Sequence, residues 1–233
     1  MIYVSRQSVS IALPAHNEEG NIERVVRDAL GVLSRVADQY EVIVVDDGSS
    51  DATADIVGRL AGQHPEVRLV QHPTNRGYGA AVWTGLSNCR MDLAFFTDAD
   101  DQFELGELER FMSYAPTYEA VIGYRAKRED RPHRYLLARG WGLLVSCCLG
   151  VRVRDLNCAF KLFRSERLRE IDLSATGALI NGELLARLMR RGVSLIELPV
   201  GHRPRKCGEQ SGDKPSVILR ALRELARLCF RMY

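Results

Sequence analysis

The sequence from position 42 to 50 reads Val42-Ile43-Val44-Val45-Asp46-Asp47-Gly48-Ser49-Ser50. A run of apolar, β-branched side chains is typical of a strand whose two faces are both covered. The polar turn that follows leads into a helical pattern near residues 53–62. This stretch therefore predicts a strand–turn–helix unit of the kind that builds parallel sheets.

The same alternation continues on both sides of this stretch. Further strands are predicted at residues 9–13, 67–71, 93–97, 120–124 and 193–200. Further helices are predicted at residues 18–37, with Asn17 as N-cap, and at 78–88 and 104–114. Together these patterns predict an α/β fold with a mainly parallel, Rossmann-like sheet and helices on both faces. We expect this domain to span residues 1–214 and a separate helix to span residues 215–233.

The composition is that of a globular protein, and its charge is unevenly distributed. Of the 233 residues, 46% are apolar and 27% are charged, which excludes a disordered or collagen-like chain. The net charge of +2 combines an acidic first half, with 9 basic and 19 acidic side chains in residues 1–123, and a basic second half. Residues 124–169 carry 12 basic and 4 acidic side chains, and residues 201–233 carry 8 and 3. This division predicts cation binding in the first half and anion binding in the second.

Cysteine usage and hydropathy indicate a reduced compartment without a membrane span. The six cysteines form no CxxC pair or spaced zinc framework, and no basic-then-apolar leader follows Met1. The longest largely apolar run, residues 141–151, is too short and too interrupted by glycine to cross a bilayer. We expect a cytoplasmic protein.

The last predicted helix, residues 217–233, is basic and amphipathic. At 100° per residue, its charged side chains fall within one arc of about 100°; they are Arg220, Arg223, Glu224, Arg227 and Arg231. Such a helix suits the surface of an anionic membrane, where the arginines would hold the protein near lipid. It equally suits a helix packed on the domain with its arginine face in solvent, and the sequence leaves both open.

Three polar clusters follow predicted strands, where an open parallel sheet binds its ligands. They are Pro14 to Glu18, Asp46-Asp47 and Asp98 to Gln102. So many carboxylates at one edge repel each other, and a divalent cation relieves that repulsion. Oxygen ligands without His or Cys indicate Mg²⁺ or Mn²⁺, which usually completes its shell with phosphate oxygens and water.

The phosphate cradles of other nucleotide-binding folds are absent. The first strand is followed by Pro-Ala-His-Asn-Glu instead of G-x-G-x-x-G, which argues against a dinucleotide oxidoreductase. No G-x-x-x-x-G-K-[ST] occurs, which argues against a P-loop kinase or ATPase. A diphosphate bound through a metal on Asp98-x-Asp100 describes a nucleotide-sugar site, and no feature indicates nucleic-acid binding.

The chain resembles the family-2 glycosyltransferases, whose fold is of GT-A type, in five ordered motifs. These are residues 14–18, Val45 to Ser49, Asn75 to Ala80, Asp98 to Gln102 and His202 to Arg205. Within that family it most resembles the dolichol- or polyprenol-phosphate mannosyltransferase group. The likeness extends over about residues 8–214.

The resemblance implies roles for individual residues. It implies a donor pocket lined by Pro14, His16, Glu18, Val45, Asp47, Asp98 and Ala99. Asp47 would bond the base, and Asp98 and Ala99 would lie against the ribose and sugar. The metal would be held by Asp100 and Gln102 with Asp98. Phosphate-contacting arginines would be Arg125 and Arg205, with Arg139 and Ser211 joining Arg125 at the acceptor phosphate.

Two acidic residues and two departures from the family pattern carry alternatives. Asp155 would orient the sugar or an arginine, in the catalytic set with Asp100, Arg125 and Arg205, or would cap a turn. Glu183 would complement a helix dipole or face the acceptor. The family usually has a Ser-Lys pair where this chain has Glu209-Gln210-Ser211-Gly212, with Lys214 as a substitute, and His16 stands where many relatives have Tyr.

These observations predict a metal-dependent, inverting transfer of a hexose, mannose from GDP-mannose, to a polyprenyl phosphate. The enzyme would lie peripherally on the cytoplasmic face of the membrane, where a membrane-protein partner or self-association is left open. One alternative is a UDP-sugar-dependent transferase, for glucose or another sugar, that acts on a lipid phosphate or a hydroxyl. Another is a nucleotide-binding membrane scaffold without catalysis.

Overall fold

The computed structural model describes residues 7–126, 132–205 and 215–232. The strands are β1 (Val9–Ala15), β2 (Tyr40–Asp46), β3 (Val67–Gln71), β4 (Leu93–Thr97), β5 (Ala120–Arg125), β6 (Phe160–Arg164) and β7 (Leu195–Val200). The helices of the first half are α1 (Ile22–Val36), α2 (Thr53–Gln63), α3 (Tyr78–Ser87), the 3₁₀ turn η1 (Leu105–Glu107) and α4 (Leu108–Met112). Those of the second half are α5 (Pro132–Leu149), α6 (Ser165–Arg169), α7 (Ile180–Arg190) and α8 (Pro215–Met232).

The strands form one seven-stranded sheet in the order β3-β2-β1-β4-β6-β5-β7. All neighbouring pairs are parallel except the two that β6 makes, with β4 and with β5. The mainly parallel α/β sheet expected from the sequence is therefore confirmed. Because β6 runs against the others, its first residue lies at the edge where β4 ends, with Phe160 opposite Thr97. The loop before β6 thus joins the carboxyl ends of the other strands.

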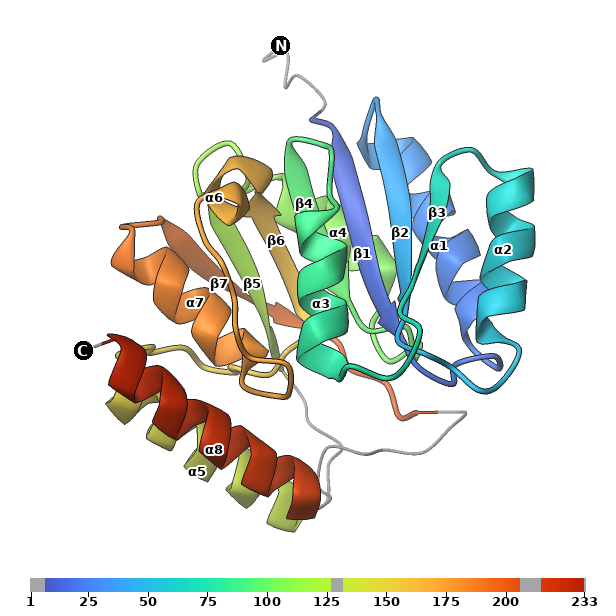
Figure 1. The fold of residues 1–233 in the computed structure, drawn as a ribbon. Coiled ribbons are helices and arrows are strands. Elements are labelled where there is room, and N and C mark those ends of the chain that lie inside the picture. The colour runs from blue at the N-terminus through green and yellow to red at the C-terminus, as the bar shows by residue number, and fades with distance from the viewer. Residues whose placement is uncertain (1–6, 127–131, 206–214, 233) are drawn as a thin grey trace.

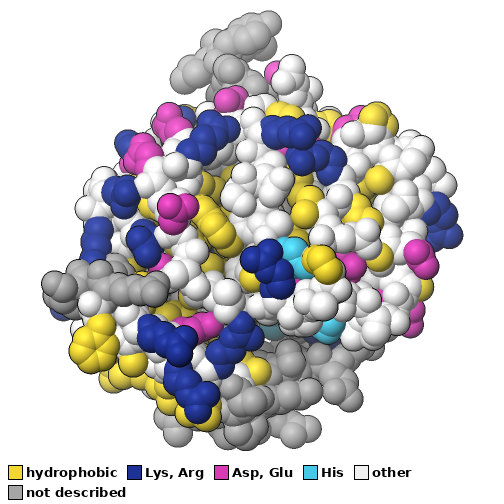
Figure 2. All heavy atoms as spheres, viewed as in Figure 1, with side chains coloured by type: hydrophobic (Ala, Val, Ile, Leu, Met, Phe, Trp, Pro, Cys, Tyr) yellow, Lys and Arg dark blue, Asp and Glu magenta, His cyan; other side chains and the backbone are white. Residues whose placement is uncertain are grey.

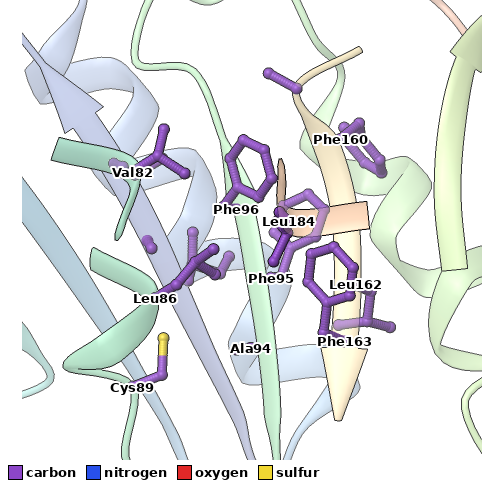
Figure 3. Packing of buried hydrophobic residues seen from close by; sticks show 14 of the residues in the cluster. Val82, Leu86, Cys89, Ala94, Phe95, Phe96, Phe160, Leu162, Phe163 and Leu184 are labelled. Carbon is purple, nitrogen blue, oxygen red and sulfur yellow. The ribbon is translucent and has the colours of Figure 1, made fainter. Parts of the chain in front are cut away.

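Helices cover both faces of the sheet. In Figure 1, α3 and α7 lie in front of it, and α1 and α4 lie behind. Between these layers β4 and β6 carry an aromatic core, with the Phe95 and Phe160 rings 4.6 Å apart between centroids (Figure 3). Phe96 and Phe163 on the same two strands are also almost fully buried. This packing fixes the middle of the sheet, from which the polar loops extend.

The first helix begins later than the sequence pattern suggests, and the prediction of Asn17 as its N-cap is wrong. Helix α1 begins at Ile22, so Asn21 is in the N-cap position. Asn17 instead has a φ of 56°, in the left-handed region, and its Oδ1 accepts a hydrogen bond of 2.8 Å from the Ser50 amide. The residues between β1 and α1 are therefore tied to the turn after β2, a long-range contact that local helical spacing does not reveal.

The last helix, α8, packs on the domain beside α5 (Figure 1). Ala221, Leu225 and Leu228 face inward and are at most 4% exposed. The outward side of α8 carries exposed apolar side chains and exposed arginines; they are Leu219, Leu222, Phe230, Arg223 and Arg227. In the part of the chain that the structure describes, no helix has the length and hydropathy of a transmembrane span.

Candidate active site

The polar loops after β1, β2 and β4 meet at one edge of the sheet. Strand β1 pairs with β2 on one side and with β4 on the other, and Pro14 lies opposite Val45. The ends of these three strands are therefore adjacent, as their order along the chain predicts. Pro14 and Val45 are both buried near the ends of β1 and β2.

Asp47 is the most firmly held carboxylate of the region. It is 2% exposed, and its Oδ1 accepts hydrogen bonds from His72 Nδ1 at 2.7 Å and from the Arg76 amide at 2.9 Å. Its Oδ2 accepts from the Gly77 amide at 2.9 Å. Asp47 thus fixes the loop between β3 and α3, which is a role that the sequence did not indicate. Its bond to a nucleobase stays a prediction.

The loop after β1 is hydrogen-bonded to the segment after β2 through backbone and side-chain atoms. His16 Nδ1 lies 3.0 Å from the Asp47 carbonyl oxygen. The amide of Glu18 donates to Thr53 Oγ1 at 2.8 Å, and its own carboxylate accepts from Asn21 Nδ2 at 2.8 Å. The structure therefore brings His16, Glu18 and Asp47 together, as the resemblance implies.

The aspartates after β4 lie where their charges are costly. Burial raises the pKa of Asp98 to about 7, with a further contribution from the charge of Asp100. Burial also raises the pKa of Asp100, against the opposing effect of the Arg205 guanidinium. Asp98 accepts a 3.0 Å hydrogen bond from the Tyr78 hydroxyl, while Asp101 between this pair and Gln102 has a φ of 60°. Ala99, which lies between Asp98 and Asp100 in the sequence, is buried.

This pair fits a divalent cation that is also bound by phosphate. Raised carboxyl pKa values show that nearby positive charge is favourable, and both side chains offer the oxygen atoms that Mg²⁺ and Mn²⁺ prefer. No group of three or more His, Cys, Asp or Glu side chains in the described residues is arranged to hold a metal. One or two carboxylates are the usual protein share of a magnesium site, with water and phosphate supplying the rest.

Gln102, the other predicted ligand, is engaged in a second role. Its side-chain Nε2 donates to the Arg203 carbonyl oxygen at 2.9 Å, and its backbone carbonyl oxygen accepts from the Arg203 amide at 2.7 Å. These two bonds join the loop after β4 to the segment that follows β7. Gln102 as a metal ligand stays a prediction.

Arg205 reaches into the acidic region from the segment after β7. Its guanidinium is bonded to the Glu18 carboxylate and lies 3.5 Å from Asp100 Oδ2. The Arg205 side chain is 15% exposed, so this positive charge is held inside the site. A guanidinium in that position is suited to a diphosphate, because it binds two phosphate oxygens at once.

Arg125, at the end of β5, forms a bidentate ion pair with Asp155. Arg125 Nε lies 2.7 Å from Asp155 Oδ2, and Arg125 Nη2 lies 3.0 Å from Oδ1. The side chains are 14% and 9% exposed. Of the alternatives for Asp155, the geometry matches the one in which it orients an arginine.

A buried lysine that sequence reasoning missed fixes the loop carrying Asp155. Lys161 on β6 is fully buried, and its ammonium donates to the Leu156 and Cys158 carbonyl oxygens and to Asn181 Oδ1, the last at 3.0 Å. Burial lowers the pKa of Lys161 to about 8. The available signal was a lysine amid the largely apolar residues Phe160–Arg164, a strand that the sequence pattern did not delimit.

Glu183 on α7 serves the fold. Its carboxylate accepts from the Ser174 and Ala175 amides at 2.9 and 2.7 Å and pairs with Arg187 at 2.7 Å, and it is fully buried. It therefore fixes the segment before α7 instead of facing an acceptor. Three further predictions lie outside what the structure describes: Ser211, Lys214 and the side chain of Arg139, whose backbone belongs to α5.

The arrangement joins carboxylates from one half of the chain and arginines from the other at a single sheet edge. Carboxylates with raised pKa values can hold a cation, and arginines beside them can hold phosphates. Charge that develops on a departing diphosphate would be stabilised by such fixed groups.

Comparisons with known proteins bear on the family of the chain. A sequence model described as "Glycosyl transferase family 2" matches residues 10–187, from β1 to α7. A dolichyl-phosphate beta-glucosyltransferase (ALG5C) of Trichomonas vaginalis is 33% identical over 212 residues, covering 82% of this chain and 62% of the relative. An undecaprenyl-phosphate 4-deoxy-4-formamido-L-arabinose transferase of Edwardsiella ictaluri is 31% identical over 206 residues, covering 87% and 62%. The chain thus spans about three-fifths of the length of these curated relatives.

Solved structures confirm the GT-A type of fold. Glucosyl-3-phosphoglycerate synthase from Mycobacterium tuberculosis, in complex with Mn²⁺, UDP and glucosyl-3-phosphoglycerate, superimposes with a TM-score of 0.71 at 23% identity. The match covers 96% of this chain and 80% of that one. The same synthase is also known with Mg²⁺ and UDP.

Proposed function

The chain belongs to glycosyltransferase family 2, and we propose that it transfers a hexose from a nucleotide-diphosphate sugar to a polyprenyl phosphate. The observation that carries this proposal is the meeting of Asp98 and Asp100 with Arg205 and Arg125 at one sheet edge. That meeting supports a site for a metal-bound diphosphate with a second phosphate beside it. Two relatives with polyprenyl-phosphate substrates in their names support the same acceptor class.

For the donor we propose glucose ahead of mannose. The sequence motifs alone favoured GDP-mannose, with a UDP-sugar as the alternative. The relatives named above are a glucosyl- and a formamido-arabinosyltransferase, and neither name includes mannose. Asp47 would bond either guanine or uracil through lone pairs that its bonds to the Arg76 and Gly77 amides leave open.

Asp100 and Asp98 would hold Mg²⁺ or Mn²⁺ in this reaction, with Gln102 as a further candidate. The bound ion would act as a Lewis acid that neutralises charge on the leaving diphosphate. Arg205 adds a fixed positive charge on the same side. Arg125, oriented by Asp155, would bind the acceptor phosphate.

A phosphate acceptor needs no general base, because it is already an anion at neutral pH. This matches the described residues of the site, where Asp155 and Glu183 are engaged in ion pairs with Arg125 and Arg187. Direct attack by the phosphate on the face opposite the leaving group would invert the anomeric carbon. The site's remaining work is orientation and charge stabilisation.

A membrane surface is the natural source of such an acceptor, and we propose that α5 and α8 face it. Exposed apolar side chains cluster on these helices; they are Leu143, Leu144, Leu219, Leu222 and Phe230, and Phe230 is 89% exposed. Figure 2 shows hydrophobic and basic side chains together at the lower left of the molecule, over α8. A surface of this composition suits the headgroup region of an anionic bilayer.

The test is transfer by the purified protein. Radiolabelled UDP-glucose and GDP-mannose would be supplied in turn with Mn²⁺ and undecaprenyl phosphate in vesicles containing phosphatidylglycerol. Lipid-linked product with UDP-glucose and a β-configured bond from an α-configured donor would support the proposal. No transfer from any nucleotide sugar to any polyprenyl phosphate, with nucleotide bound at the site, would leave a binding scaffold as the better explanation.

A further inference from the structure

Two polar side chains of α8, Arg220 and Glu224, bind segments next to the predicted donor pocket around Asp47 and Asp98. Arg220 Nη2 donates to the Arg76 carbonyl oxygen at 3.2 Å and to Thr176 Oγ1 at 2.5 Å. The Glu224 carboxylate accepts from the amides of Thr176 at 3.2 Å and Gly177 at 3.3 Å. The two side chains also contact each other, with Arg220 Nε 3.3 Å from Glu224 Oε1. Arg220 and Glu224 therefore attach α8 to the domain by hydrogen bonds, whereas Arg223 lies on the outward side of the helix.

The segment that Arg220 and Glu224 bind, Thr176-Gly177, packs tightly against the start of α3. The Gly79 amide donates to the Thr176 carbonyl oxygen at 3.0 Å. A Cβ on Gly79 would lie 2.6 Å from the Gly177 carbonyl oxygen. A Cβ on Gly77, whose φ is 105°, would lie 2.5 Å from the Thr176 carbonyl oxygen and 3.0 Å from the Arg220 guanidinium nitrogens. Only glycine allows this approach, so a displacement of α8 is transmitted to residues 75–79.

Residues 76–78 connect this segment to Asp47 and Asp98 of the predicted donor pocket. The amides of Arg76 and Gly77 bind the two carboxylate oxygens of Asp47, and the Tyr78 hydroxyl binds Asp98. Arg220 thus bonds the carbonyl of the same residue whose amide bonds Asp47. Its own guanidinium touches neither aspartate in these contacts.

We propose that Arg220 and Glu224 are positioning residues that hold residues 75–79 in the conformation that binds the donor nucleotide. The inference rests on the proposed function for the identity of the ligand, but the mechanical link is a property of the fold. Loss of either side chain frees residues 75–79 to move, so the nucleotide must order them when it binds. Donor KM and Kd therefore rise, while kcat at saturating donor stays within about twofold because the bound state is the same.

The experiment compares Arg220→Ala and Glu224→Gln with Arg223→Ala in the full chain. Arg223→Ala removes the same charge from the exposed side of the same helix. Two readouts are measured: the Kd of UDP and of GDP with Mn²⁺ by calorimetry, and amide hydrogen exchange of residues 75–79 in the free protein. We expect about tenfold weaker nucleotide binding, equal to about 1.4 kcal/mol, and faster exchange in both test variants. Arg223→Ala should leave both readouts unchanged.

A conservative variant separates positioning from general loss of structure. Arg220→Lys keeps a cation that can donate to the Arg76 carbonyl oxygen or Thr176, and should recover part of the affinity and part of the exchange protection. Faster exchange with unchanged nucleotide affinity would overturn the proposal, as would unchanged exchange in both test variants. If the unaltered protein binds neither nucleotide, the proposed function fails, and exchange at residues 75–79 still decides whether Arg220 holds them.

Discussion

The acidic and basic groups at the sheet edge are held in different ways. On the acidic side, peptide amides orient the carboxylates: Arg76 and Gly77 donate to Asp47, and Gln102 donates to Asp100 at 3.2 Å. On the basic side, carboxylates orient the arginines, with Asp155 on Arg125 and Glu18 on Arg205. A peptide amide fixes a carboxylate without neutralising it, whereas an ion pair neutralises the arginine it orients.

This difference suggests a division of work between the two halves of the site. On the acidic side, Asp98 and Asp100 have raised pKa values, so a bound cation would favour their ionised forms. The basic side must exchange a carboxylate partner for a phosphate, or share its donors between the two, before it can act on substrate. We expect activity to fall when an acidic side chain loses its charge. On the basic side, we expect it to fall even when the charge is kept and only the planar guanidinium geometry is lost.

The largest effect is expected from Asp100→Asn. This change keeps the shape of the side chain but removes the charge that would hold the metal, so glycosyl transfer should fall about a thousandfold. Mn²⁺-dependent binding of UDP, measured by calorimetry, should weaken with it. The control is Asp55→Asn, which removes an exposed charge in the first turn of α2. Equal metal-dependent nucleotide binding in both variants would contradict the assignment of Asp100.

On the basic side, Arg125→Lys keeps the charge and removes the planar fork. Because Arg125 is bound by Asp155 through two nitrogens, a lysine cannot reproduce the orientation. We expect kcat/KM for the polyprenyl phosphate to fall about 100-fold with donor affinity unchanged. The exposed Arg152 provides the matched control, Arg152→Lys. An Arg125→Lys enzyme with normal acceptor kinetics would show that charge alone is enough on this side.

The support beneath Arg125 can be tested through Lys161→Met. Methionine fills a similar volume but leaves the Leu156 and Cys158 carbonyl oxygens and Asn181 without the ammonium. We expect the free energy of unfolding to drop by about 2–3 kcal/mol, as measured by urea denaturation. Arg164→Met on the same strand, where Arg164 bonds one carbonyl oxygen, should lower it by less than about 1 kcal/mol. Equal losses in the two variants would remove the special role of Lys161.

The sequence predicts the acidic side better than the basic side, for a physical reason. Each apolar run of the first half ends directly in its polar cluster, and parallel strands bring those ends together, so Asp47 and Asp100 follow from local pattern. The direction of β6 depends on contacts with β4 and β5, and local pattern does not contain it. Asp155 therefore had two open interpretations until β6 placed its loop beside Arg125.

Contacts between distant parts of the chain were beyond the sequence pattern. Arg205 and Glu18 are 187 residues apart in the sequence, and Arg220 and Arg76 are 144 apart. Helical periodicity placed Arg220 with Arg223 and Arg227 on one charged face. The structure distinguishes them, because all three are exposed but Arg220 also bonds Arg76 and Thr176 of the domain. Periodicity shows which side chains share a face but not which part of that face the rest of the fold covers.

The smallest expected effect sharpens the acidic side of the comparison, since Asp98→Asn should stabilise the free protein. Burial raises the Asp98 pKa from 3.8 to about 7, so ionisation costs the folded state free energy as pH rises through that range. The variant lacks this cost, and the partial exposure of Asp98 reduces it to about 1–2 kcal/mol at pH of about 8. Urea denaturation at about pH 8 should favour the variant, whereas at about pH 4 the two proteins should be similar. Nucleotide binding with Mn²⁺ should weaken in the same variant, because the charge that destabilises the free fold is the one that a cation needs. A variant no more stable than the unaltered protein at about pH 8 would show that the Tyr78 hydroxyl already stabilises the ionised carboxylate in full.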